Sequence, residues 1–142
     1  MTRGREGDGH VDIAWTRLEE DDDALWQDSQ CLYAYAEPDT DELFYIGKAD
    51  YQTVRQRLYG PHKEDLFNDL DLDEVAVVHG ALVLEPGRRL TSELLGDVEA
   101  LLIMELQPPG NVAYTHSRPS RPGMTVACVG DWLWTPAAFE DD

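Results

Sequence analysis

One stretch of the chain, residues 75–84 (VAVVHGALVL), is apolar at nearly every position. A strand with one face in water alternates apolar and polar residues, whereas a strand buried on both faces is a continuous apolar run. We therefore predict a strand here that is covered on both sides. The longest helical pattern follows at residues 91–106 and ends before Pro108-Pro109-Gly110. With 142 residues, the chain is long enough for one domain and too short for a second full one.

Two further strand-like segments occupy residues 31–36 and 43–47, and the turn-forming residues between them predict a β-hairpin. Short strands are also expected at residues 11–15 and 125–129. The core order β–β–α–β–α, with an extra strand near each end, predicts an α/β (α+β) fold. We expect a small mixed, mainly antiparallel sheet flanked by helices.

A short helix is expected after the second hairpin strand. Asp50 is a suitable N-cap, and Tyr51, Val54 and Leu58 fall on one helical face. The helix is expected to end near Gly60-Pro61.

Composition divides the chain into three parts. Residues 1–28 form an acidic N-terminal extension, in which the run 19–23 is interpreted as a solvated loop. Residues 29–112 hold the predicted core. Residues 113–142 are expected to pack on the same domain as a C-terminal extension, with residues 140–142 frayed.

The formal net charge of −18 repels nucleic acid at long range and, taken alone, argues mildly against DNA binding. No apolar run approaches the roughly 20 residues that span a bilayer, and the N-terminus shows no secretory signal, so no membrane partner is expected. Cys31 and Cys128 make neither a disulfide framework nor a metal-ligand spacing. They are expected to be reduced thiols of a cytoplasmic protein.

The positive charge is concentrated in two stretches. Between residues 43 and 63 the only acid is Asp50, and residues 106–130 contain no acid at all. The arginines and lysines of these stretches are Lys48, Arg55, Arg57, Lys63, Arg118 and Arg121. Such a distribution favours a surface that binds an anion. For the second stretch, a plain surface loop rich in Pro and Ser is an equal alternative.

One acid breaks the pattern of the long helix. At about 100° per residue, Glu99 falls between Leu106 and Ile103, inside the apolar face. A carboxylate in that position needs a cation, a salt-bridge partner or a proton. A metal ligand and a plain salt bridge explain it equally well. His79, inside the apolar strand, is expected to be a hydrogen-bonded core residue rather than a ligand.

Three motifs follow one another along the chain. The first pairs Tyr33 with the run Phe44-Tyr45-Ile46-Gly47-Lys48-Ala49. The second is Arg57-Leu58 followed by His62. The third, from Glu99 to Asn111, reads E-x-x-L-I-x-x-x-x-P-x-x-N without a gap. Together they span residues 31–112 and resemble the GIY-YIG nuclease family, which includes homing endonucleases, some restriction enzymes and the N-terminal nuclease domain of the bacterial excision-repair subunit.

The resemblance implies a metal-dependent endonuclease that hydrolyses DNA phosphodiester bonds. Tyr33 resembles the general base, Tyr45 would hold the phosphate or the attacking water, and Arg57 would bind phosphate oxygens. His62 would protonate or position a phosphate oxygen, and Glu99 would bind Mg²⁺ (or Mn²⁺). The residues expected to bind the substrate are Gly47, Lys48, Arg55, Asn111, Arg118 and Arg121, and among these Asn111 is also expected to fix the loop after the long helix.

The chain departs from the family pattern at two points. Cys31 stands where the first motif usually has a glycine, and the spacing from Tyr45 to Arg57 is longer than usual, so Arg55 is a rival for the catalytic arginine. The high negative charge leaves two alternatives open. One is a catalytically weak or inactive domain of the same fold that binds a protein or nucleic-acid partner, and the other is an acidic mimic of DNA. A protein partner could also supply targeting to the enzyme.

Overall fold

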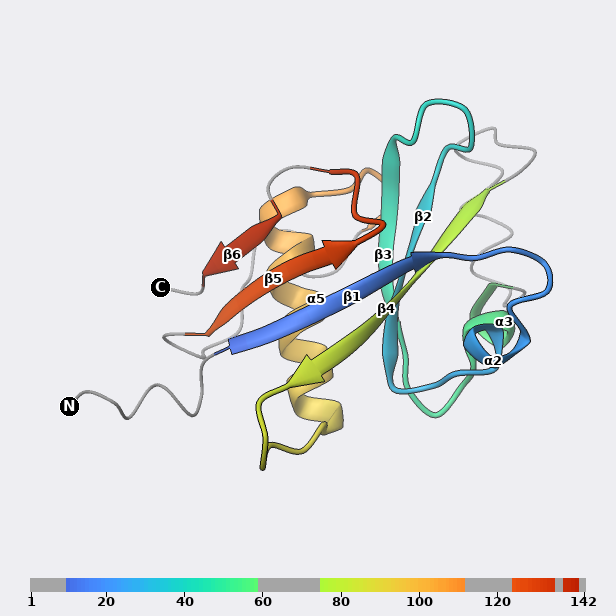
Figure 1. Ribbon diagram of the computed structural model, residues 1–142. Helices are drawn as coiled ribbons and strands as arrows, with labels where there is room; N and C mark the ends of the chain where they lie inside the picture. Colours follow the sequence, from blue (N-terminus) through green and yellow to red (C-terminus); the bar gives the residue numbers. More distant parts are fainter. Residues whose placement is uncertain (1–9, 59–74, 112–123, 135–136, 141–142) are drawn as a thin grey trace.

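The computed structural model describes residues 10–58, 75–111, 124–134 and 137–140. Within these ranges six strands form one sheet in the order β3-β2-β4-β1-β5-β6 (Figure 1). The strands are β1 (His10–Arg17), β2 (Cys31–Ala36), β3 (Leu43–Ala49), β4 (Ala76–Leu84), β5 (Thr125–Gly130) and β6 (Ala138–Glu140). Every neighbouring pair is antiparallel except β1 and β5, which are parallel. The predicted small, mainly antiparallel α/β fold is confirmed.

The helices in these ranges are α2 (Asp23–Trp26), α3 (Val54–Leu58) and α5 (Ser92–Leu106). Thr91 caps α5, because its side chain accepts a hydrogen bond from the Leu94 backbone N–H at 3.0 Å. Gln107, in the left-handed region at φ 48°, ends the helix before the prolines. None of these helices is long and apolar enough to cross a membrane.

Strand β1 occupies an interior position of the sheet. It pairs with β4 on one side and with β5 on the other. Val11, Ile13 and Trp15 are buried on one face, as the alternating sequence of this segment predicted. Residues 10–17 therefore belong to the same sheet as β2, β3 and β4.

Helix α5 covers one face of the sheet (Figure 1). It buries more of its circumference than the sequence pattern indicated, since Leu94, Ala100 and Leu101 are buried together with the predicted apolar face. From β2, Leu32 and Ala34 point into this core, and from β4 Val78 does the same. The opposite face carries a second apolar cluster.

The second cluster is built from the other side chains of β2. Cys31, Tyr33 and Tyr35 are buried there, against Val54 of α3 and Trp26 of α2. The two short helices cover only this end of the sheet. Strand β4 is buried at every position from Ala76 to Gly80, but Val83 further along is 52% exposed. The prediction of a strand buried on both faces is therefore right for its first half and wrong for its second.

Helix α3 begins later than predicted. The Thr53 hydroxyl accepts from the Gln56 N–H at 3.1 Å, and the Gln56 side chain accepts from the Thr53 N–H at 2.8 Å. This reciprocal pair is a capping box, so Thr53 and not Asp50 marks the start of the helix. Tyr51 lies before it with a left-handed φ of 68° and is 87% exposed. The prediction that Tyr51 shares a helical face with Val54 and Leu58 is therefore wrong, and the predicted end at Gly60-Pro61 lies outside the described residues.

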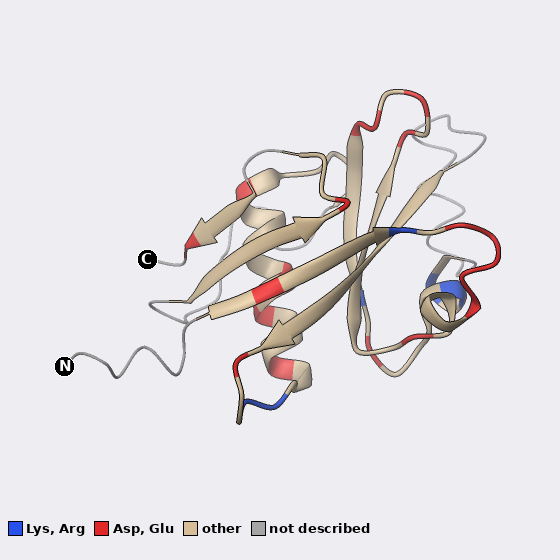
Figure 2. Ribbon diagram, in the orientation of Figure 1, with Lys and Arg blue, Asp and Glu red and all other residues tan. Residues whose placement is uncertain are grey.

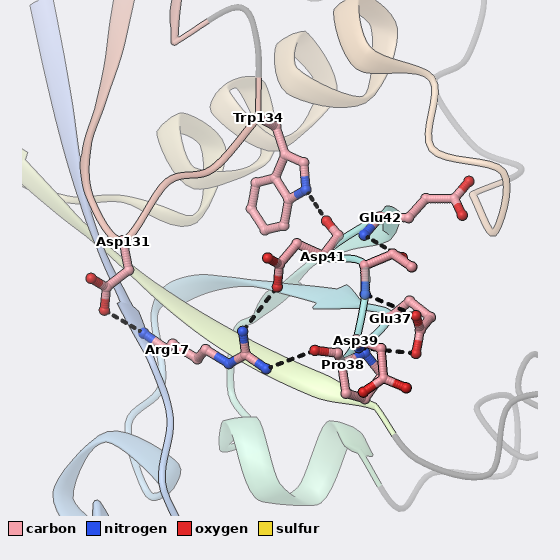
Figure 3. A network of polar contacts seen from close by, with 9 residues as sticks. Arg17, Glu37, Pro38, Asp39, Asp41, Glu42, Asp131 and Trp134 are labelled. Carbon is pink, nitrogen blue, oxygen red and sulfur yellow. Dashed lines mark hydrogen bonds and ion pairs between the residues drawn. The ribbon is translucent and has the colours of Figure 1, made fainter.

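Polar contacts attach the C-terminal segment to the rest of the domain (Figure 3). The Asp131 carboxylate accepts from the Arg17 N–H at 2.9 Å, and the Arg17 guanidinium donates to Asp41 at 3.0 Å. The Trp134 indole N–H donates to the Asp41 carbonyl. The segment after β5 thus packs on the hairpin between β2 and β3. Strand β6 adds residues 138–140 to the sheet, so Glu140 lies in a strand rather than in a frayed end.

Candidate active site

Three tyrosines form the centre of the candidate site, and we call Tyr33, Tyr35 and Tyr45 the tyrosine cluster. Tyr35 pairs with Tyr45 across β2 and β3, and Tyr33 pairs with Gly47, so the side chains share one face of the sheet. The ring centroids lie 5.1 Å apart for Tyr33–Tyr35, 5.4 Å for Tyr35–Tyr45 and 6.1 Å for Tyr33–Tyr45. Tyr33 and Tyr35 are fully buried, whereas Tyr45 on the edge strand is half-buried.

Gly47 leaves the space that the Tyr33 ring fills. A Cβ at Gly47 would lie 2.5 Å from the Tyr33 hydroxyl oxygen and 2.9 Å from a ring carbon of Tyr45. Carbon atoms in ordinary contact are about 3.5–4.0 Å apart. The glycine of the second tyrosine motif is therefore required by packing, whether or not it also approaches a substrate.

The structure separates the two rival arginines. The Arg57 Nε donates to the Tyr33 hydroxyl at 3.4 Å, so this guanidinium borders the tyrosine cluster. Arg55 points elsewhere, with its guanidinium carbon 4.8 Å from the centroid of the Trp26 ring. This contact is a cation–π interaction between α3 and α2. Of the two, Arg57 is the one that lies with the tyrosines.

The tyrosine hydroxyls are held in their neutral form. Burial raises the pKa of Tyr33 above its ordinary value, the neighbouring Tyr45 raises it further, and the Arg57 charge only partly opposes this. Burial also raises the pKa of Tyr45, against the hydrogen bond with Tyr33 and the charge of Arg57. Tyr33 is therefore a neutral phenol in the free chain at neutral pH, and it becomes a base only if further positive charge reaches it.

Glu99 is buried on α5, with 8% of its surface exposed, as the sequence predicted. The negative charge of Glu99 contributes to the raised pKa of Tyr45, so the carboxylate acts electrostatically on the tyrosine cluster. Lys48 also approaches α5. Its Nζ lies 3.3 Å from where a Cβ at Gly96 would be, and Gly96 precedes Glu99 by three residues on the helix surface.

The candidate groups therefore border both faces of β3. In the register with β2, Tyr45 lies on the face of the tyrosine cluster, while Lys48 lies opposite Leu32 on the face of α5. Because β3 is the edge strand, both faces meet at the same margin of the sheet. Figure 2 shows few Lys and Arg residues and many acids, including a run of acids that leads into α2.

Asn111 has a structural role at this margin. Its Oδ1 accepts from the Ile46 N–H at 2.9 Å, and its Nδ2 donates to the Ile46 carbonyl at 2.7 Å. The Gly110 N–H donates to the Phe44 carbonyl at 2.7 Å. The loop after α5 thus satisfies the backbone of the edge strand, which an open edge would leave unpaired. The expectation that Asn111 fixes this loop is confirmed.

His79 is confirmed as a hydrogen-bonded core residue. It is 2% exposed, and its Nε2 lies 2.8 Å from Asp28 Oδ2. Burial raises the pKa of Cys31 to about 12, and the charge and hydrogen bond of Asp28 raise it as well. Nothing in the spacing of residues 28, 31 and 79 indicates that they meet, so the sequence does not mark Asp28 as a candidate site residue.

Three expected site residues, His62, Arg118 and Arg121, lie outside the described residues. The structure brings together Tyr33, Tyr45 and Arg57, with Gly47 beneath them. Lys48 of β3 reaches α5, the helix that carries Glu99. Comparison with known proteins found no matching family model, no similar curated protein and no similar solved structure.

Proposed function

We propose that the protein is a metal-dependent endonuclease that hydrolyses DNA phosphodiester bonds. The observation that carries the proposal is the contact between Arg57 and the Tyr33 hydroxyl, 3.4 Å apart, beside the half-buried Tyr45. A guanidinium and phenolic hydroxyls in one place can bind the anionic oxygens of a phosphodiester. The spacing of these residues in the GIY-YIG-like motifs supports the same proposed function.

In this proposal Arg57 and Lys48 supply the positive charge that attracts the phosphate. Arg57 has a planar fork of donors that matches two phosphate oxygens, whereas Lys48 acts as a point charge. Tyr45 is the most accessible hydroxyl of the tyrosine cluster, and it holds a phosphate oxygen or the attacking water. His62 is proposed to protonate or position a further oxygen. Arg55, Arg118 and Arg121 are proposed to contact the DNA outside the cleaved bond.

Glu99 is proposed to hold Mg²⁺ or Mn²⁺. The donor set fits, because Mg²⁺ binds through one or two carboxylates and retains most of its water ligands. The burial of Glu99 also fits, since a carboxylate that is 8% exposed is stabilised by a cation. When bound, the metal supplies positive charge that stabilises the transition state and lowers the pKa of a water.

Tyr33 is proposed as the general base. Its raised pKa keeps Tyr33 protonated in the free chain, and further positive charge beside Arg57 would favour the loss of that proton. The proton then leaves through Tyr45, which is hydrogen-bonded to Tyr33 and reaches the surface. Activity should therefore depend on both tyrosines and on the positive charge beside them.

A binding module without catalysis is the second candidate. The net charge of −18 favours it, as does the run of acids that Figure 2 shows leading into α2. An acidic surface repels DNA and attracts basic partners. Both candidates place the protein in a reducing compartment such as the cytoplasm, because Cys31 and Cys128 are buried free thiols.

The test is incubation of the full chain with plasmid and single-stranded DNA, with Mg²⁺ or Mn²⁺ and with excess chelator. We expect nicking or cleavage that the chelator abolishes and that Glu99→Ala removes. Glu93→Ala is the matched control, because Glu93 is an exposed acid on the same helix. Cleavage that survives Glu99→Ala or the chelator would refute the proposal. Absence of cleavage by the wild type, together with capture of a basic partner, would favour the binding module.

The two arginines provide a second comparison. Arg57→Ala should lower the cleavage rate by about 100-fold, as expected for the loss of a preorganised group that stabilises the transition state. Arg55→Ala should reduce it much less, because Arg55 faces Trp26. Equal losses in the two variants would mean that the contact with Tyr33 does not mark the catalytic arginine.

A further inference from the structure

Three potential metal ligands converge on the face of the sheet that carries the tyrosine cluster. Asp28 precedes β2, Cys31 is the first residue of β2, and His79 lies on β4. One ligand atom from each, the carboxylate oxygen, the thiol sulfur and a ring nitrogen, lies within 4.8 Å of the others. Cys31 and His79 are 1% and 2% exposed, and neither has a role in the proposed hydrolysis.

The backbone holds these residues in place. Cys31 and His79 sit on neighbouring strands, and His79 is the register partner of Tyr33, two residues after Cys31. The Asp28 carbonyl accepts from the N–H of Val54, the first residue of α3, at 3.1 Å. Gln30, which directly precedes Cys31, adopts a left-handed φ of 60° and donates its N–H to the carbonyl of Ala49. The segment that carries Asp28 is therefore fixed to both β3 and α3.

We propose that Asp28, Cys31 and His79 form a binding site for Zn²⁺. Sulfur, imidazole nitrogen and carboxylate oxygen are the ligands that zinc takes in proteins, whereas Mg²⁺ takes oxygens. Three protein ligands leave a fourth position for water. The Asp28 side chain is 42% exposed, so the ion can enter from its side while the other two ligands remain inside.

The distances agree with a tetrahedral ion after small shifts. Bonds of about 2.0–2.3 Å from zinc to N, O and S set neighbouring ligand atoms about 3.4–3.6 Å apart. His79 Nε2 and Asp28 Oδ2 are 2.8 Å apart and must separate slightly, and the widest separation in the group is below 4.8 Å. Rotation of the half-exposed Asp28 side chain supplies most of this movement.

Binding changes the protons of the site in a defined way. Zinc takes the Cys31 sulfur as a thiolate, so the thiol proton passes to solvent. Asp28 binds through a carboxylate oxygen, and His79 binds through the Nε2 lone pair with a proton on Nδ1. The Cys31 proton is therefore released when the ion binds.

The alternative is that the three side chains only form a hydrogen-bonded network, in which the thiol and the imidazole both donate to Asp28. Co²⁺ distinguishes the two, because tetrahedral Co²⁺ with a thiolate ligand gives a sulfur-to-cobalt charge-transfer band and intense visible bands. The full chain is stripped with chelator, dialysed and titrated with Co²⁺. We expect saturation at one equivalent, displacement by Zn²⁺, and a higher Tm with Zn²⁺.

Matched variants locate the site. Cys31→Ser should abolish the charge-transfer band and weaken Zn²⁺ binding by at least about tenfold. Cys128→Ser is the control, because Cys128 is also a buried free thiol and lies outside the group. Asp28→Asn provides a second test, because its side chain is partly exposed and loss of the carboxylate should weaken Zn²⁺ binding.

Absence of the charge-transfer band in the wild type would overturn the proposal, and so would an equal band in Cys31→Ser. The proposal is independent of the nuclease function. Glu99→Ala should remove cleavage and leave the cobalt spectrum unchanged, whereas Cys31→Ser should remove the spectrum. A protein that binds Co²⁺ through Cys31 but cleaves no DNA would retain the zinc site and lose only the proposed activity.

Discussion

Gly47→Ala tests whether the packing of the tyrosine cluster depends on the missing side chain. The new Cβ would lie 2.5 Å from the Tyr33 hydroxyl oxygen, 2.6 Å from the carbon that bears it and 2.9 Å from a ring carbon of Tyr45. Restoring ordinary contacts of about 3.5 Å requires Tyr33 to recede by roughly 1 Å. Tyr33 is fully buried and its ring centroid is 5.1 Å from that of Tyr35, so the ring cannot recede freely.

The expected cost follows from this geometry. Adding a methyl group to a packed core typically costs about 1–3 kcal/mol. Divided by the unfolding entropy of a domain of this size, that loss of free energy corresponds to a decrease in Tm of roughly 3–10 °C. Movement of Tyr33 also changes its contact with Arg57, now 3.4 Å, so any activity that needs this contact should fall as well.

The assay is denaturation in urea, with thermal unfolding and the near-ultraviolet circular dichroism of the tyrosines measured in parallel. A lower midpoint with an unchanged slope means lost stability of the folded state. Gly80→Ala is the control. A Cβ there would lie 2.8 Å from the Trp15 ring in the other core cluster, so it should lose similar stability and leave the tyrosine signal unchanged.

A Gly47→Ala variant as stable as the wild type, with its tyrosine signal intact, would refute this account of the glycine. The reasoning would fail in another way if Gly80→Ala altered the tyrosine signal as strongly as Gly47→Ala does. In that case the two core clusters would not be separate packing units.

Three other changes have defined outcomes. Gly96→Ala should raise the free energy of unfolding by about 0.5–1 kcal/mol in urea titrations, since a Cβ there meets only the flexible end of Lys48 and alanine favours the helix. Asn111→Ala should cost about 1–3 kcal/mol by the same measurement and should speed amide exchange in β3, because both side-chain bonds to that strand are lost. Burial raises the pKa of Cys31 to about 12 and that of Cys128 to about 11, from 9.0, so their contribution to stability is complete below pH 9 and is lost as pH rises toward these values. Urea titrations above pH 9 should show about 1.4 kcal/mol lost per pH unit for each thiol that stays protonated, and Cys128→Ser should remove one of these contributions.

The elements with local signals could be predicted from the amino-acid pattern alone. The continuous apolar run gave strand β4, the alternating and turn-forming residues gave the β2–β3 hairpin, and the long periodic segment gave α5. The burial of Glu99 also followed from its place in that periodic pattern. These features depend on residues a few positions apart, which is why inspection of the chain finds them.

The pairing of distant segments could not be predicted in this way. β1 lies between β4 and β5 because the sheet hydrogen bonds pair residues 10–17 with segments far along the chain, and no local pattern encodes that choice. The start of α3 is different, because it is set by a local capping box between Thr53 and Gln56, a stronger signal than Asp50 as a cap.

The same distinction holds within the candidate site. The motif spacing left Arg55 and Arg57 as rivals, and the packing of α3 on α2 turned Arg55 toward Trp26 and Arg57 toward Tyr33. The meeting of Asp28 with His79 arose in the same way, because strand pairing brings together residues that lie 51 positions apart. The sequence therefore shows which reactive side chains are present. Non-local hydrogen bonds and packing decide which of them come together in one site.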